Sequence, residues 1–207
     1  LFLLYGPYNG FRDFLITTAM STMNHQYLAT TFYSGDTIDK VLKSHSTVEP
    51  EFNTDTSLII LEENAKANLL VCDHSSNEKA TLSTQVTEVF LHPGASLNLV
   101  EIEETAGNNS RLSHLFVEQD ANSTFTHSNI TLTNGFTRNN TKVTLAGSGA
   151  EAHLGGLAIC DKKQHTDNHT LVEHKVGHCN SSELYRYILD EESTGVFAGK
   201  MLIRPNA

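Results

Sequence analysis

Apolar and polar residues alternate along most of the chain after residue 51. Between 86 and 91, for example, Val86, Glu88 and Phe90 fall on one side of an extended chain, and Thr87, Val89 and Leu91 fall on the other. Alternation rich in β-branched residues is typical of half-buried strands. It predicts a first set of strands at 57–61, 85–91, 113–118, 142–146, 170–175 and 195–204. A second set is predicted at 68–71, 97–100, 124–126 and 184–188, and directly after residue 150.

A turn that ends in a small residue separates the two strands of each unit. The markers are Ala65, Ala95, Ala121, Ala150, Ser181 and Ala207, at spacings of 30, 26, 29, 31 and 26 residues. A steady period of this length indicates stacked structural repeats. Small residues at inward corners let the turns above and below approach closely. The sequence therefore predicts an all-β fold, a parallel β-helix. The alternative, an antiparallel sandwich or jelly roll, explains the strands but not the recurring corner.

The repeat divides the chain into two parts. Residues 1–50 lack it and are predicted to form an irregular N-terminal segment, with a short helix at 36–42 capped by Asp36. Residues 51–207 are predicted to form the β-helix core. Because the last unit is half complete at Ala207, we expect this core to be truncated at its C-terminal end.

Composition excludes several classes of partner. The 207 residues carry a net charge of −10, which argues against binding to nucleic acid or to an anionic membrane surface. No apolar run is long enough to span a bilayer. The three cysteines, Cys72, Cys160 and Cys179, are odd in number and far apart, which favours a reducing, cytoplasmic setting over a disulfide framework.

Six N-x-[ST] sequences favour a different setting. They lie at Asn108, Asn122, Asn129, Asn139, Asn168 and Asn180. Such sequences are acceptors of N-linked glycans in secreted proteins. They are also what chance gives when Asn and Thr are common in solvated strands and turns. A secreted, polysaccharide-active β-helix enzyme or adhesin is therefore kept as an alternative.

Histidines and a cysteine gather in one region and suggest a metal site. They are His165, His169, His174, His178 and Cys179. On a strand, residues four apart share a face but lie about 13 Å apart, too far to share one ion. His174, His178 and Cys179 therefore remain weak metal candidates that need ligands from a neighbouring rung or another chain.

No complete active site can be assembled from the remaining residues. Cys72 and His74 share a strand face at i, i+2, about 7 Å apart, which is outside hydrogen-bond contact. The carboxylates are predicted to be solvated, because they fall near turns and loop ends: Glu62, Glu63, Glu101, Glu103, Glu104, Asp190, Glu191 and Glu192. No catalytic residue and no cofactor-binding residue is assigned, and the chain is not predicted to be an enzyme.

The second half of the chain resembles the core of the SufB/SufD family. The resemblance rests on an ordered set of segments: Arg138, 143–150, 154–157, 164–174, 182–186 and 196–200. Within them, the family-motif positions are Arg138, Gly147, Gly149, Asp167, His174, Ser182, Phe197 and Gly199. Each segment alone is weakly specific, but their order and separation are specific together.

This resemblance implies a right-handed parallel β-helix and a role in iron–sulfur cluster assembly. It implies a SufB-like β-helix subunit and a SufC-like ATPase as partners, with a homodimer possible for the isolated chain. Val196–Gly199 is more like SufD than SufB, and Val143 stands where SufB tends to have a cysteine. The resemblance thus favours a non-catalytic, SufD-like subunit. It implies that this chain binds no cluster alone, and that a cluster is possible only in the assembled complex.

Overall fold

The protein is built from β-strands. The computed structural model describes residues 18–22, 25–32, 37–45, 52–74, 80–205 and 207, with side chains from residue 54 onward. Sheet A contains β1 (Thr18–Thr22), β2 (His25–Phe32), β4 (Phe52–Leu61), β6 (Leu82–Leu91), β8 (Ser110–Gln119), β10 (Phe136–Leu145), β12 (His165–His174) and β14 (Thr194–Ile203). Sheet B contains β3 (Thr37–His45), β5 (Lys66–His74), β7 (Ser96–Glu104), β9 (Thr124–Thr133), β11 (Glu151–Cys160) and β13 (Asn180–Leu189). Nowhere in the described ranges is there a helix long and apolar enough to cross a membrane.

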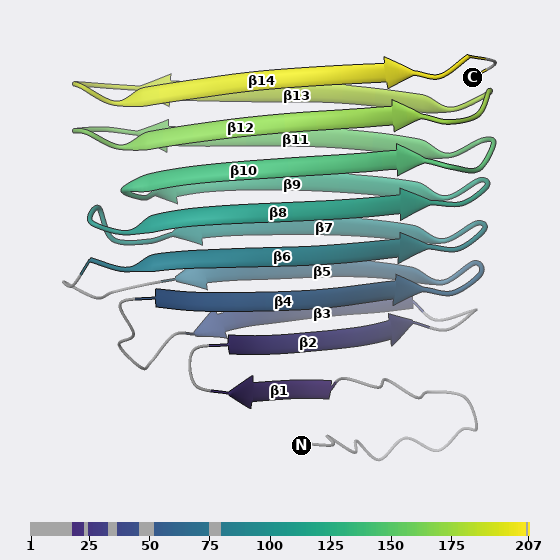
Figure 1. Cartoon of the computed structure of the whole chain (residues 1–207), viewed down its shortest axis with the longest axis horizontal. Helices are drawn as coiled ribbons and strands as arrows, with labels where there is room; N and C mark the ends of the chain where they lie inside the picture. The colour runs from purple at the N-terminus through teal and green to yellow at the C-terminus, as the bar shows by residue number, and fades with distance from the viewer. Residues whose placement is uncertain (1–17, 23–24, 33–36, 46–51, 75–79, 206) are drawn as a thin grey trace.

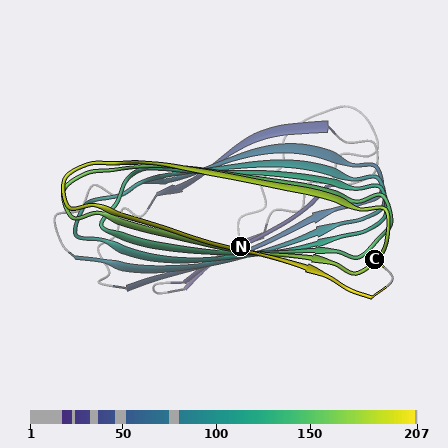
Figure 2. The ribbon, with the colours of Figure 1, turned by 90° about the horizontal axis from the view of Figure 1, so that it is seen from above.

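The strands wind into a right-handed parallel β-helix, as predicted. From β2 onward, successive strands alternate between the two sheets, and each pairs in parallel with the strand one rung away, as β10 does with β8 and β12. In Figure 1 the strands of sheet A from β2 onward run to the right in front, those of sheet B return behind, and the chain climbs from N to C. Seen from above, the two sheets face each other across a flattened cross-section (Figure 2). Among the described strands, only β1 pairs antiparallel, with β2, so the sandwich alternative is excluded.

The N-terminal segment differs from its prediction. Within 1–50, which was expected to be irregular, β2 pairs in parallel with β4, and β3 pairs in parallel with β5, so the solenoid begins upstream of residue 51. The predicted helix at 36–42 is wrong, because residues 37–45 form β3. Pairing with a neighbouring strand outweighs the weak local helix signal of so short a segment. Residues 1–17 and the proposed cap Asp36 lie outside the described residues.

A column of buried corner residues marks the turns from sheet A to sheet B. Its members are Ala65, Ala95, Ser123, Ala150 and Cys179, and the first four are fully buried. Each follows a residue with positive φ, namely Asn64, Gly94, Asn122, Gly149 or His178. The predicted markers Ala121 and Ser181 were therefore wrong by two residues. With Ser123 and Cys179 in their place, the spacings narrow to 30, 28, 27 and 29 residues, and Ala207 follows 28 residues later.

The interior is apolar on one side and polar on the other. The apolar side lies next to the corner turns. There, the C-terminal halves of the sheet A strands and the N-terminal halves of the sheet B strands point aliphatic side chains inward. This apolar core includes Leu61, Leu69, Leu91, Leu99, Phe125, Val143 and Leu145, all at most 2% exposed. The opposite half of the same interior holds charged and amide side chains, and it contains the candidate site.

Candidate functional site: a polar network inside the β-helix

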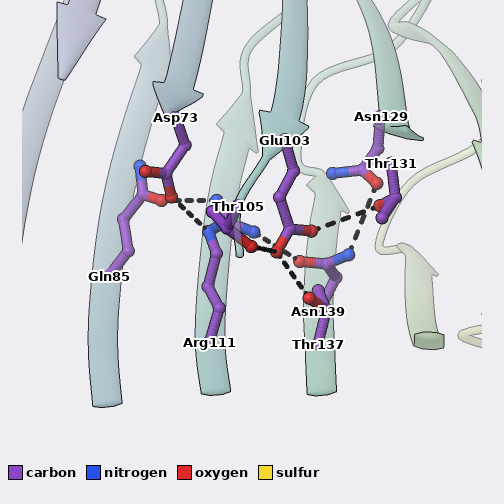
Figure 3. A network of polar contacts seen from close by, with 9 residues as sticks. All are labelled: Asp73, Gln85, Glu103, Thr105, Arg111, Asn129, Thr131, Thr137 and Asn139. Atoms are coloured by element: carbon purple, nitrogen blue, oxygen red, sulfur yellow. Dashed lines mark hydrogen bonds and ion pairs between the residues drawn. The ribbon is translucent and has the colours of Figure 1, made fainter. Parts of the chain in front are cut away.

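Arg111 lies at the centre of the polar half. Its side chain points inward from β8, and the residue is 3% exposed. Its guanidinium donates from Nε to Asp73 Oδ2 at 2.8 Å, from Nη1 to Asn139 Oδ1 at 2.9 Å, and from Nη2 to Gln85 Oε1 at 2.6 Å. Figure 3 shows these partners arriving from both sheets. A buried guanidinium is stable only when its charge and its donors are satisfied, and here a carboxylate and two amide oxygens do so.

Glu103 is the second buried charge of the network. Its carboxylate, on β7, accepts hydrogen bonds from Thr137 Oγ1 at 2.5 Å and from Thr105 and Thr131 Oγ1 at 3.3 Å each (Figure 3). Burial raises the pKa of Glu103, while the charge of Arg111 and the threonine hydrogen bonds act in the opposite direction. Glu103 is therefore harder to ionise than a glutamate in water, although Arg111 and the threonines reduce the effect of burial.

Glu101 and His127 form a separate buried pair beside Glu103. His127 Nε2 lies 2.8 Å from Glu101 Oε2, and the two residues are 2% and 6% exposed. Burial acts to raise the pKa of Glu101, but the hydrogen bond and charge of His127, with the charge of Arg111, bring that pKa below its usual value. Two carboxyl groups two residues apart on one strand thus have pKa values displaced in opposite directions.

Amide side chains carry the hydrogen bonds onward to the last described rung. Asn139 Nδ2 donates to Asn168 Oδ1 at 3.0 Å and to Asn129 Oδ1 at 3.3 Å. Asn168 Nδ2 donates to Tyr187 Oη at 2.8 Å, and Tyr187 Oη donates to the Val196 carbonyl at 2.8 Å. The hydrogen-bonded chain therefore crosses from sheet B near Asp73 to β14. Because each rung supplies a partner to the next, the network fixes the register of the stack.

The network corrects two expectations. Glu101 and Glu103 were expected to be solvated, but both point inward with Leu97 and Leu99, because all four have the same parity on β7. Three of the potential glycosylation sites are also buried, with Asn129, Asn139 and Asn168 at 6%, 5% and 4% exposure. The sequence did contain a signal for this burial. Along each strand every second residue points inward, and these polar residues fall at the inward positions.

The family-motif residues do not converge on one point. Arg138 and Asp167 meet on the outer face of sheet A, with Arg138 Nη1 3.1 Å from Asp167 Oδ2. His169 Nε2 lies 2.8 Å from the other carboxylate oxygen of Asp167. The remaining positions take part in separate contacts: Gly147 and Gly149 in a corner turn, His174 with Ser181 at 2.9 Å, Ser182 with His153 at 2.9 Å, Phe197 stacked on Tyr185 at 4.6 Å, and Gly199 on β14 close to Glu183 and Phe197.

The proposed metal ligands are also dispersed. His174 points inward, His178 occupies the positive-φ position of a corner turn, and Cys179 fills the corner, where its Sγ donates to the Gly147 carbonyl at 3.3 Å. His165 and His169 lie on the outward side of β12. In the part of the chain that the structure describes, no three His, Cys, Asp or Glu side chains are placed to hold a metal ion. Cys160 is buried, with its Sγ 3.4 Å from Thr166 Oγ1, and Cys72 and His74 lie on the outer face of β5.

The corner assignment of Cys179 predicts which substitutions it tolerates. Alanine occupies the equivalent corner in three other turns, so Cys179→Ala should lower the free energy of unfolding by less than about 1 kcal/mol. Cys179→Val adds a branch at a crowded corner and should cost about 1–3 kcal/mol. Urea unfolding measures both variants. If Cys179→Ala or His178→Ala lowers the metal content of the purified protein, these residues are ligands and the corner assignment is incomplete.

The displaced pKa values predict opposite pH dependences for the two buried glutamates. The pKa of Glu101 in the folded state is below its unfolded value near 4.5. The ionised Glu101 therefore stabilises the fold above pH 4.5, and this stabilisation is lost as the pH falls below 4.5. The stability difference between wild type and Glu101→Gln should therefore shrink in acid. The folded-state pKa of Glu103 is raised, so its carboxyl group stabilises the fold less as the pH rises above 4.5. Urea unfolding of both variants from pH 3.5 to pH 7 tests the signs, and parallel pH profiles would contradict them.

Comparison with known proteins places this β-helix in a family. Residues 43–207 match the family model for the SUF system FeS cluster assembly, SufBD core domain. An iron–sulfur cluster assembly SufBD family protein from Synechocystis sp. (strain ATCC 27184 / PCC 6803 / Kazusa) is 20% identical over 154 residues, which are 70% of this chain and 34% of that protein. The iron–sulfur cluster assembly protein SufD from Escherichia coli (strain K12) is 31% identical over 93 residues, which are 45% of this chain and 22% of that protein. The chain thus spans a minor part of either relative. Because the family model covers most of the chain, the protein belongs to the SufBD family of iron–sulfur cluster assembly proteins.

Proposed function

We propose that the chain acts as a SufD-like, non-catalytic subunit of a cytoplasmic iron–sulfur cluster assembly complex. Its partners in this proposal are a SufB-like β-helix subunit and a SufC-like ATPase. The family assignment and the match to a protein named SufD support the proposal. The observation that carries it is Val143, fully buried on β10 just before the Gly147–Gly149 turn, at a position where SufB tends to have a cysteine.

The position of Val143 explains why the missing thiol matters. Its side chain points into the apolar core together with Leu145 and Val172, and all three are completely buried. A valine there contributes packing energy and offers no sulfur for cluster or sulfide chemistry. The three thiols that the chain does have, Cys72, Cys160 and Cys179, lie at unrelated places in the fold. In this proposal the chain supplies architecture, and any cluster is held with ligands from its partners.

The secreted-enzyme alternative loses half of the glycosylation sequences that suggested it, because three of the six are buried. Asn129, Asn139 and Asn168 donate or accept hydrogen bonds inside the folded β-helix, so a glycan could not be attached to them without disrupting the network. The interior charges Glu101, Glu103 and Arg111 are buried inside the β-helix, where a polysaccharide could not contact them. We therefore advance the assembly role alone.

Co-purification tests the proposal. The tagged chain is co-expressed with the SufB-like and SufC-like proteins of the same organism, and the eluate is analysed by size-exclusion chromatography and native mass spectrometry. A complex containing all three chains is expected, whereas the chain expressed alone should elute as a monomer or homodimer. An unrelated β-helix protein with the same tag serves as the control. Elution of the chain without either partner would contradict the proposal.

A further inference from the structure

The outer face of sheet B carries a patch of apolar side chains. On β5, β7, β9, β11 and β13, the residues between the inward positions point outward, and in the C-terminal halves of these strands most of them are aliphatic. The outer patch comprises Leu70, Val100, Ile102, Ile130, Leu132, Leu157, Ile159, Leu184 and Ile188. Strand register places its members side by side, as with Ile102, Ile130 and Leu157, or with Ile159 and Ile188.

This patch is not a surface that a further rung of the solenoid would cover. Phe197, Met201 and Ile203 are also exposed, but they occupy inward positions of β14, where another rung stacked on the end would bury them. Leu184 and Ile188, at 59% and 58% exposure, point away from the interior on β13. Stacking adds neighbours along the solenoid axis and does not cover an outer face. A contiguous apolar patch of this kind marks an interaction surface.

Arg186 indicates the chemistry of the occupant. It lies on β13 between Leu184 and Ile188, on the same outward face, and its backbone pairs with that of Leu157. Among the described residues, no carboxylate forms an ion pair with it, although the chain carries 24 Asp and Glu against 14 Lys and Arg. A guanidinium within an apolar surface is typical of the centre of protein interfaces, where a partner's carboxylate satisfies it.

We propose that the outer patch binds an amphipathic helix that places an apolar stripe on sheet B and a carboxylate against Arg186. Faces of parallel sheets are normally covered by helices, whose apolar stripe matches the pleated surface. A second copy of the same face would add a second guanidinium to the contact, so charge favours an acidic partner over self-association. This inference does not depend on the proposed assembly role.

Site-specific photo-crosslinking in cells tests the proposal. A benzoyl-phenylalanine is placed at Ser128, an outward residue of β9 that pairs with Val100 of the outer patch and with Gly155. The matched control places it at Ser110, an outward residue of β8 on sheet A. Mass spectrometry then identifies the crosslinked peptide. We expect a segment with apolar residues at helical spacing and at least one Asp or Glu, captured from Ser128 and not from Ser110.

Two substitutions make the result decisive. Arg186→Glu should lower the crosslink yield about tenfold, as loss of a central charged contact does, and reversing the acidic residue of the identified segment to Lys should restore it. Ile159→Asp should abolish the crosslink. Because Arg186 and Ile159 are exposed, circular dichroism should show an unchanged fold. Crosslinks to a second copy of the chain, a yield that Arg186→Glu leaves unchanged, or no crosslink would each overturn the proposal.

Discussion

Replacing Arg111 by methionine is expected to lower the free energy of unfolding by about 3–5 kcal/mol, the usual cost of leaving a buried charge without its partner. Methionine retains much of the volume but none of the donors. The substitution leaves Glu103 as a buried carboxylate without its nearest cation, and it leaves Gln85 and Asn139 without the donors they accept from. Urea unfolding followed by circular dichroism measures the loss.

A surface cation and a double variant serve as controls for Arg111. Lys163 forms an ion pair with Glu192 in which both side chains are more than three-quarters exposed, so Lys163→Met should cost less than about 1 kcal/mol. Adding Glu103→Gln to Arg111→Met should recover part of the lost stability, because the stranded charge is removed. The buried residues do not form a coupled network if Arg111→Met lowers the free energy of unfolding no more than Lys163→Met does. The same holds if the effects of Arg111→Met and Glu103→Gln on that free energy are additive.

Replacing Gly147 by alanine is expected to destabilise the protein by about 3 kcal/mol or more, at the upper end of the cost of overpacking. Gly147 lies in the corner turn before Ala150, stacked directly on the preceding turn. A Cβ at this position would overlap the backbone of Asp120 and Ala121, which cannot move aside as a flexible side chain can. The two turns are also joined by the hydrogen bond from Asn122 N to the Ser148 carbonyl at 3.0 Å, so a shift in one turn disturbs the other.

Gly155 provides a matched control on the same stretch of chain. It lies on β11, and a Cβ there would meet nothing closer than the His127 and Leu184 carbonyl oxygens, at 3.7 and 3.9 Å. Gly155→Ala should therefore be neutral or slightly stabilising, since alanine loses less conformational entropy on folding. Equal effects of the two substitutions in urea unfolding would show that close stacking of the turns does not determine stability.

The fold was predictable from the sequence because the alternation and the recurring turn can both be read directly from the order of the residues. Residues 86–91 alternate as predicted, and the structure shows that Val89 and Leu91 point inward while Glu88 and Phe90 point outward. The corners at Ala65, Ala95 and Ala150 are fully buried. Two corners were predicted at the wrong residues, Ala121 and Ser181, because these small residues matched the pattern of the other turns. The true corners, Ser123 and Cys179, are the residues that follow a positive φ. Backbone conformation, rather than residue size, defines the corner, and composition does not reveal it.

The polar network was not predicted, because it violates the rule that charges lie in solvent. Arg111, Glu101 and Glu103 occupy inward positions by parity, but charged residues are rarely buried unless they are paired. The pairing itself joins residues 26 to 38 positions apart, as Arg111 with Gln85 and Asp73. Only the stacking of rungs brings such residues together. The resemblance to the SufB/SufD family, in contrast, was readable from the sequence, and the family model confirms it.

The proposed role of the chain, that of a subunit that supplies no cluster ligands, is tested most directly by the iron and sulfide content of the assembled complex. The complex is prepared anaerobically with wild-type chain and with a variant lacking all three thiols, Cys72→Ala, Cys160→Ala and Cys179→Ala. Co-elution confirms that the variant still assembles. We predict the same iron content, sulfide content and visible absorbance per complex for both. A cluster signal that disappears with these thiols, in a complex that remains intact, would contradict this prediction.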